Sequence, residues 1–138
     1  MPTYSAVISN KSVDRALDNF QQDLSIVFDN KSRLVGSLSG GNQQKVILAR
    51  WLFARPYILL LNDPTRGVDI PTKKDLYRLF EELAEAGVSI VLLSTDLEEL
   101  IKLSNRVLVF REGEIFETLT GNHLRRESLI AGMFGEVV

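Results

Sequence analysis

The sequence predicts an α/β fold, in which a mostly parallel sheet is flanked by helices and a C-terminal β-hairpin is followed by a last helix. Two observations predict it. Short, continuous apolar runs at residues 57–61 and 88–93 are typical of parallel strands that are covered on both faces. Segments with helical spacing of apolar residues alternate with these runs at short loop lengths, which favours α/β layers.

The N-terminal third is expected to be mainly helical. Apolar residues recur at helical spacing over residues 13–24, and Ser12 is placed to cap that helix. A weak apolar run at 24–28 is followed by a polar, turn-rich connector at 29–36. Apolar spacing then predicts a second helix over 41–54.

The rest of the chain alternates between strands and helices. The expected order is strand 57–61, helix 72–86, strand 88–93, helix 96–103, strands 106–110 and 115–119, and helix 124–134. Gly87 is well placed to end the helix before it. Residues 112–114, Glu-Gly-Glu, predict a tight turn between the last two strands.

The composition limits the classes of function. The 138 residues are 45% hydrophobic, which suffices for the core of one domain. A net charge of −2, with acids and bases interspersed, gives no basic stripe for nucleic acid. With no cysteine and a single histidine, His123, disulfides, thiolate metal sites and histidine clusters are excluded. No apolar run approaches the ~20 residues of a membrane helix, so we expect a soluble cytoplasmic chain without direct membrane insertion.

A glycine-rich motif, Leu-Ser-Gly-Gly-Asn-Gln-Gln-Lys, occupies residues 38–45. Ser39, Gly40 and Gly41 stand at the start of the second helix, so exposed N–H groups and the positive end of the helix dipole predict an anion site. The absent side chains of the glycines let a phosphate approach closely, and Gln43 is a further candidate for nucleotide binding. The simpler alternative is that the two glycines form only a loop before a helix.

The 138 residues contain no Gly-x-x-x-x-Gly-Lys-Ser/Thr phosphate loop. That loop cradles nucleotide phosphates with backbone N–H groups and a lysine. Neither ATP nor Mg²⁺ is therefore expected to bind tightly to this chain alone.

The stretch 36–113 resembles the second half of an ABC-type ATPase cassette. The motif at 38–45, the apolar strand after it and the sequence Pro-Thr-Arg-Gly-Val-Asp at 64–69 follow the family's order without a gap. Their forms are similar to those of the ribose- and galactose-type sugar importers.

The resemblance implies a single, partial P-loop NTPase-like domain over 1–138. Residues 1–35 correspond to a remnant of the family's helical subdomain. Residues 36–138 correspond to the signature motif, the Walker B-like strand and the C-terminal core. The resemblance also implies that the signature motif serves the nucleotide held by the phosphate loop of an opposing cassette.

The end of the first apolar strand departs from the family's pattern. The resemblance implies an aspartate that holds Mg²⁺ and then a glutamate that polarises the attacking water, whereas this chain has Asn62 and Asp63. Asn62 keeps an oxygen but loses the charge that favours a hard cation, so it is a degenerate metal ligand. Asp63, the catalytic candidate, is one methylene shorter than glutamate, and misplacement by about 1 Å can cost ~100-fold in rate. Alternatively, the pair simply ends a strand in a turn.

Two further acidic residues have alternative interpretations. Asp69 lies in the loop that resembles the family's inter-subunit contact, yet it also fits a turn residue beside Pro71. Ser94, Thr95 and Asp96 follow the second apolar strand, where ABC cassettes commonly have a histidine that contacts the γ-phosphate. Asp96 more simply fits the N-cap of the next helix.

Three functions compete. The first is a cassette subunit, or a fragment of one, that couples ATP binding and hydrolysis to carbohydrate transport with Mg²⁺ and the transporter's membrane subunits at the inner face of the cell membrane. The second is a stand-alone pseudo-ATPase that presents its signature motif to a partner cassette, and the third is a remnant without activity. The isolated chain is predicted to be catalytically inactive. Unpaired backbone edges at strand 58–61 predict self-association or pairing with an intact cassette.

Overall fold

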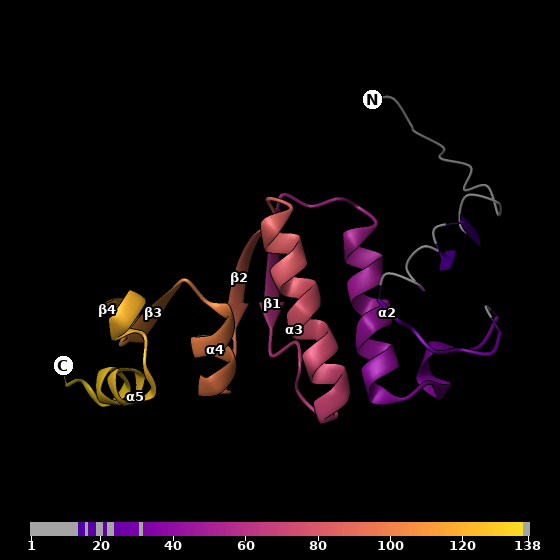
Figure 1. Cartoon of the computed structure of the whole chain (residues 1–138). Coiled ribbons are helices and arrows are strands. Elements are labelled where there is room, and N and C mark those ends of the chain that lie inside the picture. Colours follow the sequence, from indigo (N-terminus) through magenta and orange to yellow (C-terminus); the bar gives the residue numbers. More distant parts are fainter. Residues whose placement is uncertain (1–13, 16, 19–20, 22–23, 31, 137–138) are drawn as a thin grey trace. The chain divides into compact units, whose positions relative to one another are not determined.

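The computed structural model describes residues 14–15, 17–18, 21, 24–30 and 32–136. Only residues 14–15, 17–18, 21 and 24 of the helix expected over 13–24 are described. Of these, 14–15, 17–18 and 21 are helical, whereas Leu24 lies in a turn. Figure 1 shows the elements along the chain.

Contacts divide the chain into two compact units, and each is described by itself. As far as it is described, the first unit comprises residues 1–57 and 65–79, and the second comprises 58–64 and 80–138. The prediction of a single partial domain over 1–138 stays a prediction.

The first unit is built around α2 (Gly40–Leu52), which follows a single 3₁₀ turn, η1 (Val35–Ser37). Its core contains the buried residues Leu24, Ile26 and Ala49, with partly buried side chains packed against them: Phe28, Val46, Leu52 and Leu79. The apolar run at 24–28 is thus not a strand. It packs against the apolar face of α2, and this burial of apolar side chains stabilises the unit.

Helix α3 (Ile70–Glu85) begins in the first unit and ends in the second. It starts two residues before the predicted position, because Asp69 caps it: the Asp69 carboxylate accepts a hydrogen bond from the Thr72 N–H at 2.9 Å. Pro71 fits in this first turn, where a helical N–H has no partner within the helix. Gly87, with φ of 93°, follows the end of the helix in the left-handed conformation, as predicted.

As far as it is described, the second unit contains two separate two-stranded sheets. Strand β1 (Ile58–Asn62) pairs in parallel with β2 (Ser89–Leu93), and β3 (Arg106–Arg111) pairs antiparallel with β4 (Glu114–Thr120). The turn between β3 and β4 has φ of 52° at Glu112 and 86° at Gly113, as the right-handed twist of a two-residue hairpin requires. The α/β fold class is confirmed, but the described strands divide equally between a parallel and an antiparallel pair.

Helices α4 (Leu97–Leu103) and α5 (Arg126–Phe134) complete the second unit, with a 3₁₀ turn, η2 (Gly121–His123), after β4. Helix α5 packs against β3, β4 and α4. The buried core there consists of Val107, Val109, Leu119 and Leu129. None of the helices in the described part of the chain is long and apolar enough to cross a membrane.

One face of the β1–β2 pair is apolar and exposed. Leu59 and Leu61 are buried on the opposite face. The exposed face carries Ile58, Leu60, Val91 and Leu93, which are 61%, 74%, 57% and 66% exposed. Leu60 lies directly beside Val91 in the register. A parallel pair normally has both faces covered. Within the described residues this surface, called here the open β1–β2 face, is exposed instead.

Candidate functional site

Ser39 lies at the start of a helix, as the sequence predicts, and it is the N-cap of α2. Its backbone is extended, with φ of −59° and ψ of 153°, and its hydroxyl oxygen accepts a long hydrogen bond of 3.4 Å from the Asn42 N–H. Ser39 and Gly40 are exposed, and the first turn of α2 contains no acidic residue. This positive helix end is therefore accessible to an anion from solvent.

Gly40 and Gly41 have different roles at this helix start. Gly41 is buried, and a Cβ atom there would lie 2.7 Å from Cγ2 and 2.9 Å from Oγ1 of Thr72. A Cβ on Gly40 would meet only the carbonyl oxygen of Gly67, at an ordinary 3.7 Å. Gly41 thus makes room for the first turn of α3, whereas Gly40 remains open to a ligand.

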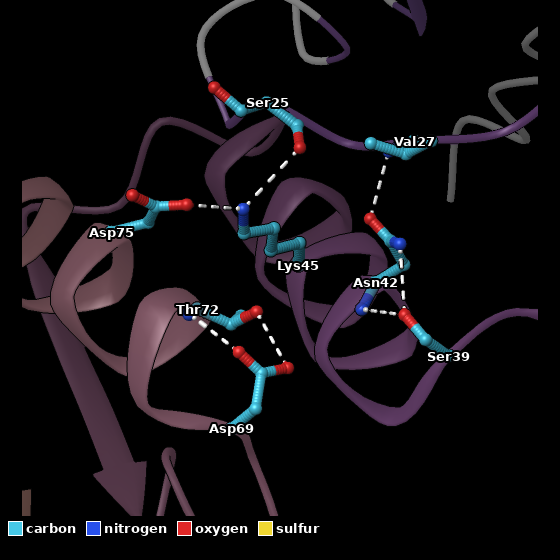
Figure 2. Close-up of polar contacts among 8 residues, drawn as sticks. All are labelled: Ser25, Val27, Ser39, Asn42, Lys45, Asp69, Thr72 and Asp75. Carbon is cyan, nitrogen blue, oxygen red and sulfur yellow. Dashed lines mark hydrogen bonds and ion pairs between the residues drawn. The ribbon is translucent and has the colours of Figure 1, made fainter.

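Asp69 uses both carboxylate oxygens to hold Thr72 (Figure 2). Oδ1 accepts from the Thr72 N–H at 2.9 Å, and Oδ2 accepts from the Thr72 hydroxyl at 3.0 Å. The backbone hydrogen bond, followed by the side-chain hydrogen bond, holds the pKa of Asp69 below its ordinary value of 3.8. These bonds give Asp69 a capping role within the chain. Its role as an inter-subunit contact stays a prediction.

Asn42 bridges the helix start to the 24–28 segment (Figure 2). Its Oδ1 accepts from the Val27 N–H at 2.8 Å, and its Nδ2 donates to Ser39 Oγ at 2.9 Å. This role of Asn42 was not predicted. The only local signal was an amide side chain three residues after a capping serine, and nothing in the sequence pointed to Val27.

Gln43 turns its side chain to the loop before the helix. Its Nε2 donates to the Leu38 carbonyl oxygen at 2.8 Å and, more weakly, to that of Gly36 at 3.4 Å. These bonds fix the approach of the chain to Ser39. The predicted role of Gln43 in nucleotide binding stays a prediction.

Lys45, the last residue of the motif, is buried and 5% exposed. Its ammonium group lies 3.0 Å from the carboxylate of Asp75 on α3 and 3.3 Å from the carbonyl oxygen of Ser25 (Figure 2). Lys45 therefore joins α2, α3 and the 24–28 segment within the first unit. It stabilises the scaffold of the site rather than facing solvent.

Asn62 and Asp63 lie in the second unit, at the end of β1. Asp63 has φ of 43°, and its N–H donates to the Leu93 carbonyl oxygen at 2.8 Å. One oxygen of its carboxylate, Oδ1, accepts from both the N–H and the hydroxyl of Thr95, at 2.8 and 3.1 Å. The side chain of Asp63 is thus fixed against the loop after β2, while Asn62 is exposed.

Asp96 caps α4, as predicted. Its carboxylate accepts from the N–H groups of Glu98 and Glu99, at 3.0 and 3.3 Å. The hydroxyl of Ser94 accepts from the Asp96 N–H at 3.0 Å and donates to the buried carboxylate of Glu99. The loop that follows β2 is therefore held by its own side chains.

The donor atoms at the end of β1 do not fit a magnesium site on their own. Mg²⁺ usually takes one or two carboxylates together with phosphate oxygens and waters. Asn62 offers a neutral amide oxygen, and one oxygen of Asp63 already accepts two hydrogen bonds from Thr95. No cluster of three or more histidine, aspartate or glutamate side chains suited to a metal occurs within the described ranges.

Comparisons with known proteins agree on one family. The family profile described as ABC transporter matches residues 2–66. "Ribose import ATP-binding protein RbsA 1" of Mesorhizobium japonicum is 45% identical over 125 residues, which is 91% of this chain and 24% of the relative. "Ribose import ATP-binding protein RbsA" of Lactococcus lactis subsp. lactis is 39% identical over 127 residues, which is 92% of this chain and 26% of the relative.

Among solved structures, the chain resembles the ATP-binding cassette MJ0796, in a dimeric, post-hydrolysis state bound to ADP and Pi. The TM-score is 0.73 at 24% identity, and the alignment covers 88% of this chain and 51% of that cassette. This likeness concerns the fold. The chain spans about a quarter of the length of the curated relatives it matches.

Proposed function

We propose that the chain is a member of the ABC transporter family, which the profile match and the ribose import relatives support, and that it acts as part of the ATP-binding cassette of a sugar importer. In its full context such a cassette couples ATP binding and hydrolysis to carbohydrate transport, in the cytoplasm and docked to the transporter's membrane subunits. The observation that carries the proposal is the exposed start of α2, where Ser39 and Gly40 face solvent and the first turn of the helix contains no acidic residue. The two ribose import relatives support the choice of a sugar as cargo.

The ligand of this helix start is the γ-phosphate of an ATP molecule whose remaining phosphates are held by a second, intact cassette. A phosphate oxygen suits this place because the helix dipole, the backbone N–H groups and the serine hydroxyl all favour negative charge. The intact cassette supplies the phosphate loop, its lysine and the ligands of Mg²⁺. The present chain supplies Ser39 and the backbone of Gly40.

The chain alone has no Mg-ATPase activity under this proposal. Three observations support that claim: the 138 residues lack a phosphate loop, Asn62 carries no charge, and the carboxylate of Asp63 is held by Thr95. Turnover above background that disappears in an Asp63→Ala variant would contradict it.

The decisive test is nucleotide-dependent association. The purified chain is mixed with an intact sugar-importer cassette that binds ATP but is disabled in hydrolysis, and complex formation is measured by calorimetry in ATP–Mg²⁺ and in ADP–Mg²⁺. We expect binding in ATP and little in ADP, and weaker but still measurable binding in Ser39→Ala. The matched control is Ser37→Ala, which removes a hydroxyl that donates to the Leu34 carbonyl oxygen. Equal binding in both nucleotides would exclude the proposed site.

A second candidate function, a module that works only when paired with another chain, is favoured by the open β1–β2 face. Its four exposed apolar side chains are contiguous. In the described part of the chain, β1 and β2 each also have one edge without a strand partner. Such edges and faces promote association, so the proposal includes self-association or pairing with an intact cassette.

A further inference from the structure

The neighbours of the Ser39 hydroxyl determine in which direction it accepts and in which direction it donates a hydrogen bond. The Val27 N–H is only a donor, so the atom of the Asn42 carboxamide that lies 2.8 Å from it is the acceptor Oδ1. The other end of the same carboxamide is then the donor Nδ2, which lies 2.9 Å from Ser39 Oγ. The orientation of Asn42 therefore follows from a backbone group fifteen residues away.

Ser39 Oγ accepts from Asn42 twice, at 2.9 Å from the side chain and at a longer 3.4 Å from the backbone N–H. A hydroxyl oxygen has two acceptor positions and one hydrogen to donate. With both acceptor positions facing Asn42, the Ser39 hydrogen is directed away from the helix, on an exposed side chain. A donor facing outward is what a phosphate oxygen, which only accepts, requires.

The geometry points to Asn42 as a positioning residue that acts through Ser39: its carboxamide orients the Ser39 hydroxyl as a donor toward the γ-phosphate of the partner-held nucleotide. Val27 is part of the same hydrogen-bonded arrangement, because its N–H fixes which end of the Asn42 carboxamide faces Ser39. This inference rests on the proposed function for the identity of the ligand. The hydrogen-bonded arrangement itself is independent of it.

The discriminating substitution is Asn42→Asp. An aspartate keeps an oxygen for the Val27 N–H but replaces the Nδ2 donor by a second acceptor, so the Ser39 hydroxyl turns inward to donate to it. Asn42→Ala, in contrast, loses both contacts. We expect Asn42→Asp to retain hydrogen-exchange protection of the Val27 amide while its ATP-dependent association weakens roughly tenfold to a hundredfold, as for loss of a hydrogen bond to a charged group.

The added negative charge of the aspartate could itself repel a phosphate, and a double-mutant cycle separates the two effects. In a Ser39→Ala background, Asn42→Asp should weaken association little further, because the hydroxyl through which Asn42 acts is gone. If Asn42→Asp weakens association by the same factor in the Ser39→Ala background as in the unsubstituted chain, the effect is electrostatic and the positioning role is overturned.

A measurement on the free chain tests the arrangement without any nucleotide. In nitrogen-15 NMR spectra, the side-chain amide of Asn42 should exchange with solvent at least several-fold more slowly than that of the exposed Asn122, and Ser39→Ala should abolish the difference. Equal exchange rates would overturn the inference. Slow exchange with no ATP-dependent association in the unsubstituted chain would instead refute the proposed function and leave the Asn42–Ser39 arrangement established.

Discussion

Thr95 donates two hydrogen bonds to the same carboxylate oxygen of Asp63, one from its backbone N–H at 2.8 Å and one from its hydroxyl at 3.1 Å. Asp63 in turn donates its own N–H to the Leu93 carbonyl oxygen at 2.8 Å. The two residues thus connect the ends of β1 and β2. Asp63, which the resemblance places at a catalytic position, therefore also stabilises this strand pair.

Replacing Thr95 by valine removes the hydroxyl donor and keeps the N–H. We expect the free energy of unfolding to fall by about 0.5–1.5 kcal/mol, the net contribution of one hydrogen bond, as measured by urea denaturation. In an Asp63→Ala background the same substitution should have little effect, since the acceptor is absent. Thr118→Val, on the exposed face of β4, is the control. Equal losses in both backgrounds would contradict the contact.

Gly41→Ala should destabilise the chain by about 1–3 kcal/mol, the usual cost of overpacking. The new methyl group would lie 2.7 Å from the side chain of Thr72. Gly40→Ala is the matched control, because its nearest neighbour is 3.7 Å away. Thermal unfolding compares the two variants, and Thr72→Ala in the same chain should recover part of the loss. Similar melting temperatures for both glycine variants would show that the close approach is unimportant.

In an Asp69→Asn variant, the free energy of unfolding should fall less steeply as the pH is lowered. The pKa of Asp69 is held below 3.8 in the folded chain, so its charged form stabilises the fold above pH 3.8. That contribution disappears as the pH falls through the lowered pKa. Urea midpoints measured between pH 7 and pH 2 should therefore decline less steeply below about pH 4 in the asparagine variant. If the urea midpoints of both proteins decline equally, the Asp69 carboxylate does not contribute to the acid dependence of stability.

Removing Asp75 and removing Lys45 should lower the free energy of unfolding by different amounts. The Lys45 side chain is 6% exposed, and that of Asp75 is 47% exposed. Asp75→Ala leaves a buried ammonium group without its carboxylate and should cost about 1–3 kcal/mol. Lys45→Met leaves an aspartate that solvent can reach and should cost less. Denaturant unfolding of the two variants checks the order, and a larger loss in the methionine variant would reverse the interpretation.

Leu60→Lys should reduce self-association, because Leu60 is 74% exposed at the centre of the open β1–β2 face. Light scattering at micromolar concentration should show a lower mass than for the unsubstituted chain. Ile47→Lys, which adds the same charge to an exposed position on α2, is the control. A monomeric unsubstituted chain would remove the basis of the prediction.

The local elements could be predicted from the sequence because they depend on neighbouring residues. Asp96 was identified as an N-cap from its place before a helical pattern, and its capping bonds are present. The start of α3 was misplaced by two residues because the predicted helix was taken to begin after Pro71, although proline is tolerated in the first turn.

The missing part of the prediction concerns contacts between distant segments. The bond from Val27 to Asn42 and the approach of Thr72 to Gly41 join residues far apart in the chain. Neither leaves a local pattern. The division of the strands into two sheets could not be predicted either, because a continuous apolar run indicates a buried strand but not which strand pairs with it.

The two strand pairs also differ in the order in which they can assemble. The β3–β4 hairpin closes through a two-residue turn at Glu112 and Gly113, and hairpins of this kind form within about 1–10 μs. The β1–β2 pair must first bring together segments separated by the whole of α3, and such non-local pairing is slower. During synthesis the hairpin can therefore close soon after its last strand emerges, whereas the apolar strand β1 stays unpaired until the whole of α3 and β2 have followed it.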